Sequence, residues 1–159
     1  MSVEPDSAQV RIPPPILIVA CLIAGWGLDW CRSWLILPAT HWVGPRVALA
    51  GALILLGLGL NGYCAWQFKR ANTRIEPWRA TSSIITQGPY RYSRNPIYLG
   101  FAIAAAGIAL VFNSCWMLLS ALAFVWIANK FVIEKEENYL ERKFGESYSN
   151  YRQTTRRWV

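Results

Sequence analysis

The densest group of side chains that could do chemistry lies in the run SSIITQGPYRYSRNPIYLG, from Ser82 to Gly100. Its tyrosines and arginines are interleaved with glycine and proline, and they are Tyr90, Arg91, Tyr92, Arg94 and Tyr98. Irregular backbone beside lipid is costly unless it packs against protein or lines a wet cavity, because its polar groups need partners. The run is therefore either a binding segment or a plain connecting loop whose arginines mark the cytoplasmic side, and its spacing fits both.

A second polar cluster occupies residues 133–159, IEKEENYLERKFGESYSNYRQTTRRWV. An apolar stripe at the helical period is formed by Ile133, Leu140 and Phe144. Glu137 falls on this stripe, where an unpaired carboxylate is expensive, whereas Glu136 lies on its flank. A helix end is expected at Gly145, followed by an aromatic and basic patch of Tyr148, Tyr151, Arg152, Arg156, Arg157 and Trp158. The alternative is a surface helix stabilised by opposite charges four residues apart.

The composition identifies the kind of protein that must position these two clusters. Hydrophobic residues make up 54% of the 159 residues and charged residues only 16%, whereas about a quarter of an ordinary soluble domain is charged. The formal charge of +7 lies in segments that flank apolar runs, which favours membrane topology and lipid headgroups over nucleic acid. Four cysteines without CxxC spacing and a single histidine, His41, argue against a metal site.

We expect a single domain with an all-α integral membrane fold of four transmembrane helices, plus a cytoplasmic C-terminal helix. A polar tail (1–13) precedes the spans, and cytoplasmic segments that carry the site are predicted at 69–95 and 132–159. The predicted spans are 16–37, 47–68, 96–112 and 115–131. Asn113 and Ser114 form a minimal turn between the last two spans, which makes these a helical hairpin.

Two smaller features of the spans have structural interpretations. Asp29 and Arg32 stand three residues apart near the end of the first apolar run, among tryptophans typical of a membrane interface, and we interpret them as an interfacial ion pair. Small residues in the third span recur on one face, at Gly100, Ala104 and Gly107. We expect this face to pack closely against the glycine-rich second span.

The distribution of lysine and arginine predicts the orientation. Of the sixteen, six lie in the connector 69–94 and seven in residues 130–159, and the turn between the last two spans has none. The positive-inside rule then places both termini and the long connector in the cytoplasm. Both polar clusters face the same side of a multi-pass membrane protein, which we expect in a bacterial inner membrane.

Together the two clusters resemble a known family. GPYRYSRNPIYLG, an apolar hairpin, and EENYLERKFGESYSNY are similar to the pattern of the isoprenylcysteine carboxyl methyltransferases and their bacterial and phospholipid-methylating relatives. That pattern is G-x-Y-x-x-x-R-H-P-x-Y-x-G, a hairpin, then E-E-x-x-L-x-x-x-F-G-x-x-Y-x-x-Y. The resemblance covers about residues 82–151, and it implies methyl transfer from S-adenosyl-L-methionine at the cytoplasmic membrane face.

The resemblance also implies a cofactor site, carried over by position. Its residues would be Ser82, Ser83, Ile84, Ile85, Tyr90, Asn95, Pro96, Ile97, Tyr98 and Glu136. An adenosyl cofactor needs aromatic walls, main-chain donors and a carboxylate for its hydroxyl or cationic groups, which agrees with these residue types. Periodicity favours Glu137 as the inward acid, whereas the resemblance favours Glu136. We therefore take Glu136 as the cofactor contact and Glu137 as a supporting acid that meets Arg94.

The chain departs from the family pattern where the substrate would bind. Asn95 and Ser82 replace histidines, and Val132 stands in place of the family's substrate-binding arginine, with Lys130 as the nearest cation. The acceptor is therefore left open, as a lipophilic or small carboxylate, thiol or lipid amine that enters among membrane lipids. A lipid phosphate or carboxylate could be bound by Arg94, Arg156 and Arg157. An amine acceptor would need a base, for which Glu137 and Tyr98 are the candidates.

Two other classes of function remain as alternatives. A non-enzymatic membrane scaffold would use the tyrosines and arginines only to bind headgroups. Membrane sterol reductases share a distantly related C-terminal architecture and bind NADPH, but their catalytic chains are much longer. No nucleic acid or metal partner is expected.

Overall fold

The computed structural model describes residues 12–38, 42–73 and 83–159. Throughout these ranges the regular structure is helical, with one isolated bridge between Leu35 and Ser114 and no strand. The helices are α1 (Pro14–Cys31), α2 (Val43–Arg70), η1 (Gly88–Arg91), α3 (Pro96–Phe112), α4 (Cys115–Ala128), η2 (Asn129–Ile133), α5 (Glu134–Phe144) and α6 (Glu146–Thr154). The expected all-α class is confirmed for this part of the chain. Ser82 and His41 lie outside the described residues.

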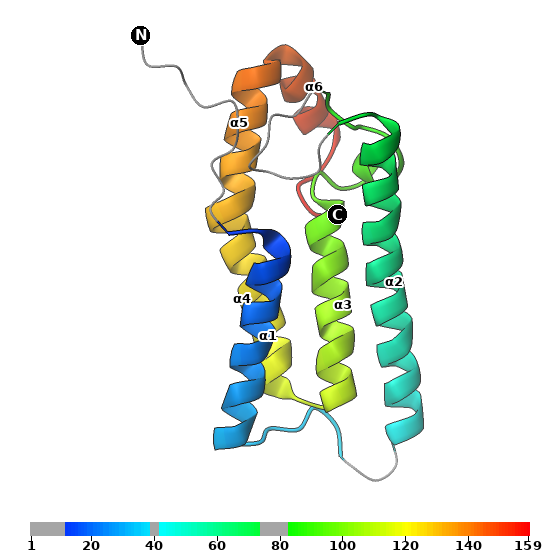
Figure 1. Cartoon of the computed structure of the whole chain (residues 1–159), viewed down its shortest axis with the longest axis vertical. Helices are drawn as coiled ribbons and strands as arrows, with labels where there is room; N and C mark the ends of the chain where they lie inside the picture. Colours follow the sequence, from blue (N-terminus) through cyan, green and yellow to red (C-terminus); the bar gives the residue numbers. More distant parts are fainter. Residues whose placement is uncertain (1–11, 39–41, 74–82) are drawn as a thin grey trace.

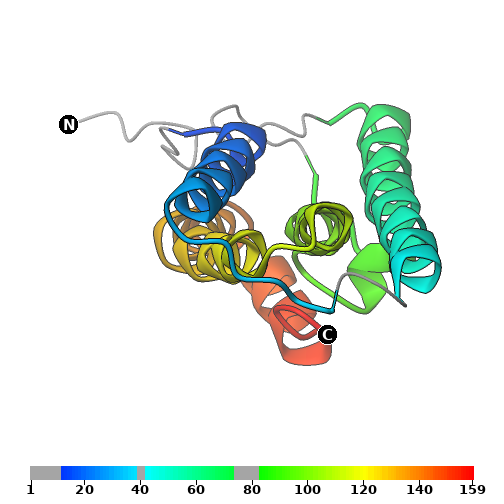
Figure 2. The same cartoon turned by 90° about the horizontal axis from the view of Figure 1, so that it is seen from below.

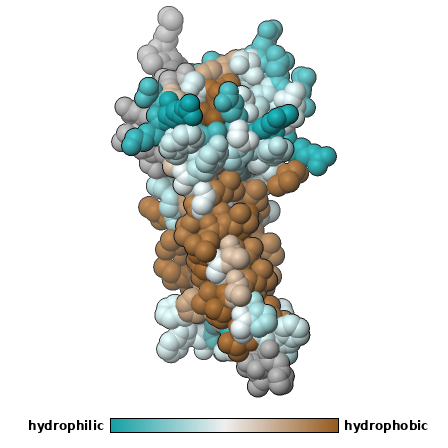
Figure 3. Space-filling view, turned by 90° about the vertical axis from the view of Figure 1, so that its right-hand side faces the viewer, coloured by the Kyte–Doolittle hydropathy of each residue, from teal (hydrophilic) through white to brown (hydrophobic). Residues whose placement is uncertain are grey.

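The long helices form a bundle with α3 in the middle. In the end-on view α2 lies on one side of α3, and α4 with α1 on the other (Figures 1 and 2). Three helices are long and apolar enough to cross a membrane, namely Pro14–Cys31, Val43–Arg70 and the continuous helix Cys115–Phe144, whereas α3 is a shorter apolar helix. On the face shown in Figure 3, an apolar band crosses the middle of the bundle between polar ends. This surface is that of a membrane protein.

The continuous helix contains a π-helical turn that the sequence does not predict. α4 passes through η2 directly into α5, so that the fourth apolar run and the second polar cluster form one rod, as expected. The rod ends at Gly145, which has a φ of +52° that favours glycine, and the expected helix stop is confirmed. The short helix α6 follows it.

The first helix is shorter than the predicted span of 16–37. α1 ends at Cys31, and Arg32 adopts an extended conformation (φ −156°, ψ 100°). The chain beyond it is drawn to the turn between α3 and α4, where the main-chain amide of Cys115 donates to the carbonyl of Trp34 at 2.8 Å. The expected ion pair between Asp29 and Arg32 is absent from the described contacts, because Arg32 has left the helix that would have brought the two side chains together.

Small residues set the close contact between α2 and α3, as expected. A side chain at Gly57 would meet the carbonyl of Gly100 and the backbone of Ala104, and one at Gly107 would meet Ala50 and Ile54. In contrast, Gly59 and Gly62 have open space around them. The contact therefore depends on Gly57 of α2 and on Gly100 and Gly107 of α3, and not on Gly59 or Gly62.

The substitution Gly57→Ala should weaken this contact. The new methyl group would push against the α3 backbone, and overpacking of this kind typically costs about 1–3 kcal/mol. Thermal unfolding in detergent should show a lower midpoint for Gly57→Ala than for the wild type. Gly59→Ala is the matched control, because nothing lies within 4 Å of its added methyl group. Equal midpoints for the two variants would contradict this role of Gly57.

Candidate functional site

The two polar clusters of the sequence meet at one end of the bundle. α5, α6, η1, the start of α3 and the C-terminal residues gather there, beyond the apolar band (Figure 1). Their placement at a common end of the molecule is consistent with the expectation that both clusters face the same side. The contacts described below join residues that lie up to 64 positions apart in the sequence.

The most direct link between the clusters joins Tyr98 to Glu136. The hydroxyl of Tyr98, at the start of α3, donates to Oε1 of Glu136 on α5 at 2.7 Å. The Tyr98 side chain is buried, and Glu136, in the first turn of α5, is half-buried. Burial raises the pKa of Glu136 to about 7, the hydrogen bond from Tyr98 lowers it in part, and the nearby charge of Glu137 raises it. Two residues assigned to one site by resemblance are thus in contact.

Glu137 is buried and held by two arginines. Its carboxylate lies 3.1 Å from Nη2 of Arg94 and accepts hydrogen bonds from Arg157 at 2.6 Å (Nη2) and 3.2 Å (Nε). Arg157 also donates to Oδ1 of Asn129, in the π-helical turn, at 3.2 Å. The expected contact between Arg94 and Glu137 is present. With both carboxylate oxygens engaged by guanidinium groups, Glu137 has the geometry of a structural acid rather than of a proton acceptor.

The C-terminal residues close this network through the main chain. The carbonyl of Arg157 accepts from Nδ2 of Asn95 at 3.1 Å and from Oγ of Ser93 at 3.3 Å, and the carbonyl of Arg156 accepts from the amide of Arg94 at 2.9 Å. The side-chain amide of Asn95 is thereby tied to protein backbone. The hydrogen bond from Asn95 to the carbonyl of Arg157 needs only a neutral N–H donor, so asparagine can make it in place of the histidine of the family pattern.

Tyr90 connects α2, η1 and α6. Its ring is buried and packs edge-on against Phe68 with a centroid distance of 5.8 Å. Its carbonyl accepts a 2.6 Å hydrogen bond from the hydroxyl of Tyr151, whose ring packs against the buried Tyr148. The aromatic residues of the last segment therefore hold the 88–94 turn in place.

The remaining predicted residues lie at different positions around this site. Pro96 is the first residue of α3 and is buried, and Ser83, Ile84, Ile85 and Ile97 are half-buried. Lys130 is exposed and pairs with Glu134 at 3.5 Å, and Arg156 is exposed. Arg157 is not free for a substrate, because its guanidinium is engaged by Glu137 and Asn129.

Sequence reasoning missed Ser93 and Asn129 as members of the network. Ser93 is buried and accepts a 3.1 Å hydrogen bond from the amide of Asn95 in addition to its bond with Arg157. A signal was present for Asn129, which is a polar residue near the end of the fourth apolar run. For Ser93 the sequence offers only its place inside the first cluster.

Removing the Glu137 carboxylate should strongly destabilise the protein. Glu137→Ala leaves Arg94 and Arg157 without their acceptor, and breaking a buried ion pair from one side costs about 3–5 kcal/mol. Thermal unfolding in detergent should detect a large fall in midpoint. The control is Arg152→Ala, which breaks an exposed pair with Glu141 (3.0 Å; side chains 48% and 42% exposed) and should cost no more than about 1 kcal/mol. Similar midpoints for both variants would exclude a central role for Glu137.

Comparison with known proteins identifies the family. The model of the family described as phospholipid methyltransferase matches residues 45–147. A protein-S-isoprenylcysteine O-methyltransferase of Schizosaccharomyces pombe is 31% identical over 107 residues, covering 58% of this chain and 44% of that protein. A protein-S-isoprenylcysteine O-methyltransferase B of Arabidopsis thaliana is 34% identical over 73 residues, covering 44% of this chain and 36% of that protein.

A shorter relative matches over its whole length. An uncharacterized protein of Haemophilus influenzae is 35% identical over 63 residues, which are 40% of this chain and all of that protein. The chain thus spans less than half the length of the two named methyltransferases. No solved structure matches. The family match covers well over half of the chain. It confirms the resemblance seen in the two sequence clusters and supports the methyltransferase class. The chain therefore belongs to the phospholipid methyltransferase family.

Proposed function

We propose that this protein is an S-adenosylmethionine-dependent methyltransferase that acts at the cytoplasmic membrane face on a lipophilic or small acceptor. The observation that carries the proposal is the hydrogen bond between Tyr98 and Glu136, which joins the two halves of the family motif in one site. Family membership supports the reaction class, and the polar end of the bundle supports its place at the membrane surface.

The residues present fit the proposed cofactor. Glu136 offers a half-buried carboxylate that can accept hydrogen bonds from sugar hydroxyls, and Tyr90 and Tyr98 offer aromatic surface. Arg94 supports the fit independently, because its Nε and Nη1 atoms are buried without a partner in the described part of the chain. Buried donors of this kind normally have an acceptor, and the carboxylate of an amino-acid moiety would supply one.

The chemistry fits an acceptor that arrives as an anion. S-adenosylmethionine supplies an electrophilic methyl group on a sulfonium, and a carboxylate or thiolate needs no base to attack it. Since both oxygens of Glu137 are occupied by Arg94 and Arg157, Glu137 is poorly placed to remove a proton from an amine. The chain's own contribution would be to position the reactants and exclude water. Arg156 and Lys130, both exposed, remain candidates for attracting an anionic acceptor.

A four-span topology with both termini in the cytoplasm accommodates this site. α3 has 17 residues, which at 1.5 Å per residue is about 26 Å, slightly short of the ~30 Å hydrocarbon core. A bilayer can adapt to a small mismatch of this size. The segments rich in lysine and arginine then lie on the cytoplasmic side with the site.

Binding of S-adenosylmethionine should depend on the Glu136 carboxylate. Calorimetry with detergent-solubilised protein should detect binding of the cofactor and none of NADPH. Glu136→Gln should weaken binding by about tenfold to a hundredfold, because hydrogen bonds to a charged group contribute about 1.5–3 kcal/mol. Glu134→Gln, on the same helix and paired with Lys130, is the control and should bind normally. Binding of NADPH instead, or unchanged affinity in Glu136→Gln, would refute the proposal.

Cofactor binding should also strengthen as the pH rises through about 7. With a pKa near 7, the Glu136 carboxyl is largely protonated at pH 6 and largely ionised at pH 8. The ionised form is the stronger hydrogen-bond acceptor for sugar hydroxyls, so affinity should be higher at pH 8. Calorimetric titrations at a series of pH values would measure the change, and Glu136→Gln should remove it. A flat profile for the wild type would argue against a titrating Glu136 in the site.

A further inference from the structure

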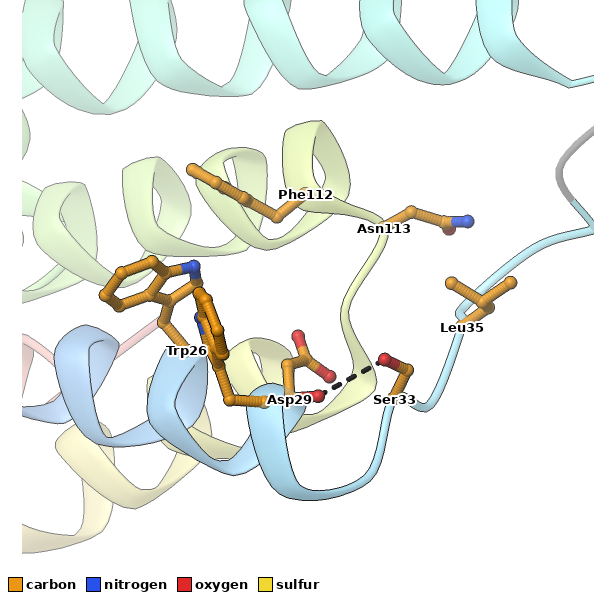
Figure 4. Close-up of a pocket in the computed structure, with 7 residues that line it drawn as sticks. Trp26, Asp29, Ser33, Leu35, Phe112 and Asn113 are labelled. Carbon is orange, nitrogen blue, oxygen red and sulfur yellow. Dashed lines mark hydrogen bonds between the residues drawn. The ribbon is translucent and has the colours of Figure 1, made fainter.

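A cavity of about 380 Å³ lies at the end of the bundle opposite the candidate site, at the C-terminus of α1. Three aromatic residues and one acid line it, namely Trp26, Trp30, Phe112 and Asp29. Figure 4 shows Asp29 beside Trp26 with its carboxylate directed toward the turn between α3 and α4. Its carboxylate has no ion pair in the described contacts, since the expected pair with Arg32 does not form. Nothing in the proposed methyl transfer uses these residues.

The walls of the cavity are held rigidly by a set of non-local hydrogen bonds. Asn113, in the left-handed conformation (φ +53°), accepts from the amide of Leu37 at 3.0 Å and donates to its carbonyl at 2.9 Å. The indole of Trp116 donates to the carbonyl of Arg32 at 2.7 Å. These bonds fix the segment after α1 against the α3–α4 turn, so the hollow between them is part of the fold. A preformed hollow that combines aromatic side chains with polar groups, here Asp29, Ser33 and Asn113, can orient a small ligand.

The chemistry of the lining selects a cationic ligand. Trp26 and Trp30 meet edge-on, with ring centroids 6.1 Å apart and planes at 84°, and both indoles line the cavity together with Asp29. Aromatic faces with an adjacent carboxylate are the preferred environment of alkylammonium groups. The cavity lies at the C-terminus of an apolar helix among tryptophans typical of a membrane interface, which is the level of lipid headgroups.

We propose that this cavity binds the ammonium headgroup of a zwitterionic phospholipid, of the ethanolamine or choline type. A stripe of exposed apolar side chains continues from the cavity along one face of α1, at Ile16, Val19, Ile23 and Trp26, with the spacing of a single helix face. This stripe matches an acyl chain that runs along the helix from a headgroup in the cavity. Arg32, exposed and next to the cavity-lining Ser33, is a cation available to the lipid phosphate.

Native mass spectrometry of the detergent-solubilised protein tests this proposal. Phosphatidylethanolamine, phosphatidylcholine and phosphatidylglycerol with identical acyl chains are compared as probes. We expect Asp29→Asn to reduce binding of the first two lipids by about fivefold or more, with little change for phosphatidylglycerol, which has no ammonium group. Trp30→Leu should have the same selectivity. Trp126→Leu is its matched control, because Trp126 is similarly exposed (66% against 79%) but lies on α4 away from the cavity lining.

Each outcome decides the proposal. An equal loss of all three lipids, no loss of any, or the same effect from Trp126→Leu overturns it. Free choline or ethanolamine, if bound as tightly as the corresponding lipid, overturns the lipid assignment and indicates a soluble amine. Unchanged thermal midpoints show that the variants are folded, and if Asp29→Asn unfolds, the comparison of Trp30→Leu with Trp126→Leu decides. Because S-adenosylmethionine binding at the other end is measured separately, failure here leaves the proposed enzyme activity untouched.

Discussion

The buried carboxylate of Glu137 is the constraint on which the polar end of the molecule depends. It brings together Arg94 from the segment before α3 and Arg157 from the C-terminal residues, while the backbone of α5 carries it. A buried charge without partners would be too expensive to keep, so these three segments must associate for the chain to fold. Their association brings Glu136, the neighbour of Glu137, to Tyr98. The geometry of the candidate site is therefore a consequence of how Glu137 is neutralised.

The apolar part of the bundle serves the same site by fixing the distance between α2 and α3. Glycine at positions 57, 100 and 107 lets the two backbones approach, which no hydrophobic effect within a membrane would enforce by itself. Tyr90 packs on Phe68 of α2, and Tyr98 belongs to α3. The separation of these two aromatic rings is thus set by small residues deeper in the bundle. The proposed cofactor site therefore depends on the same contact that holds α2 against α3.

The two ends of the bundle have different chemistry. One end gathers paired acids, arginines and buried tyrosines into a charged network suited to a polar cofactor. The other end has Asp29 among tryptophans and main-chain hydrogen bonds, without an ion pair in the described residues. A methyltransferase in a bilayer must keep a constant orientation relative to the membrane. Its site must also stay accessible to a lipophilic acceptor. A headgroup held at the far interface would contribute to both.

Features that depend on local periodicity can be predicted from the amino-acid sequence. The apolar runs predicted an all-helical chain, Asn113 and Ser114 a tight turn, Gly145 a helix end, and the helical wheel an inward Glu137. Contacts between distant groups become known only from the folded chain. Asn113 binds Leu37 across 76 residues and holds the segment beyond α1 against the α3–α4 turn. Arg157, an expected substrate contact, pairs instead with the carboxylate of Glu137, 20 residues away. Periodicity records which face of a helix is buried, whereas the choice of partner depends on contacts that form only when the whole chain has folded.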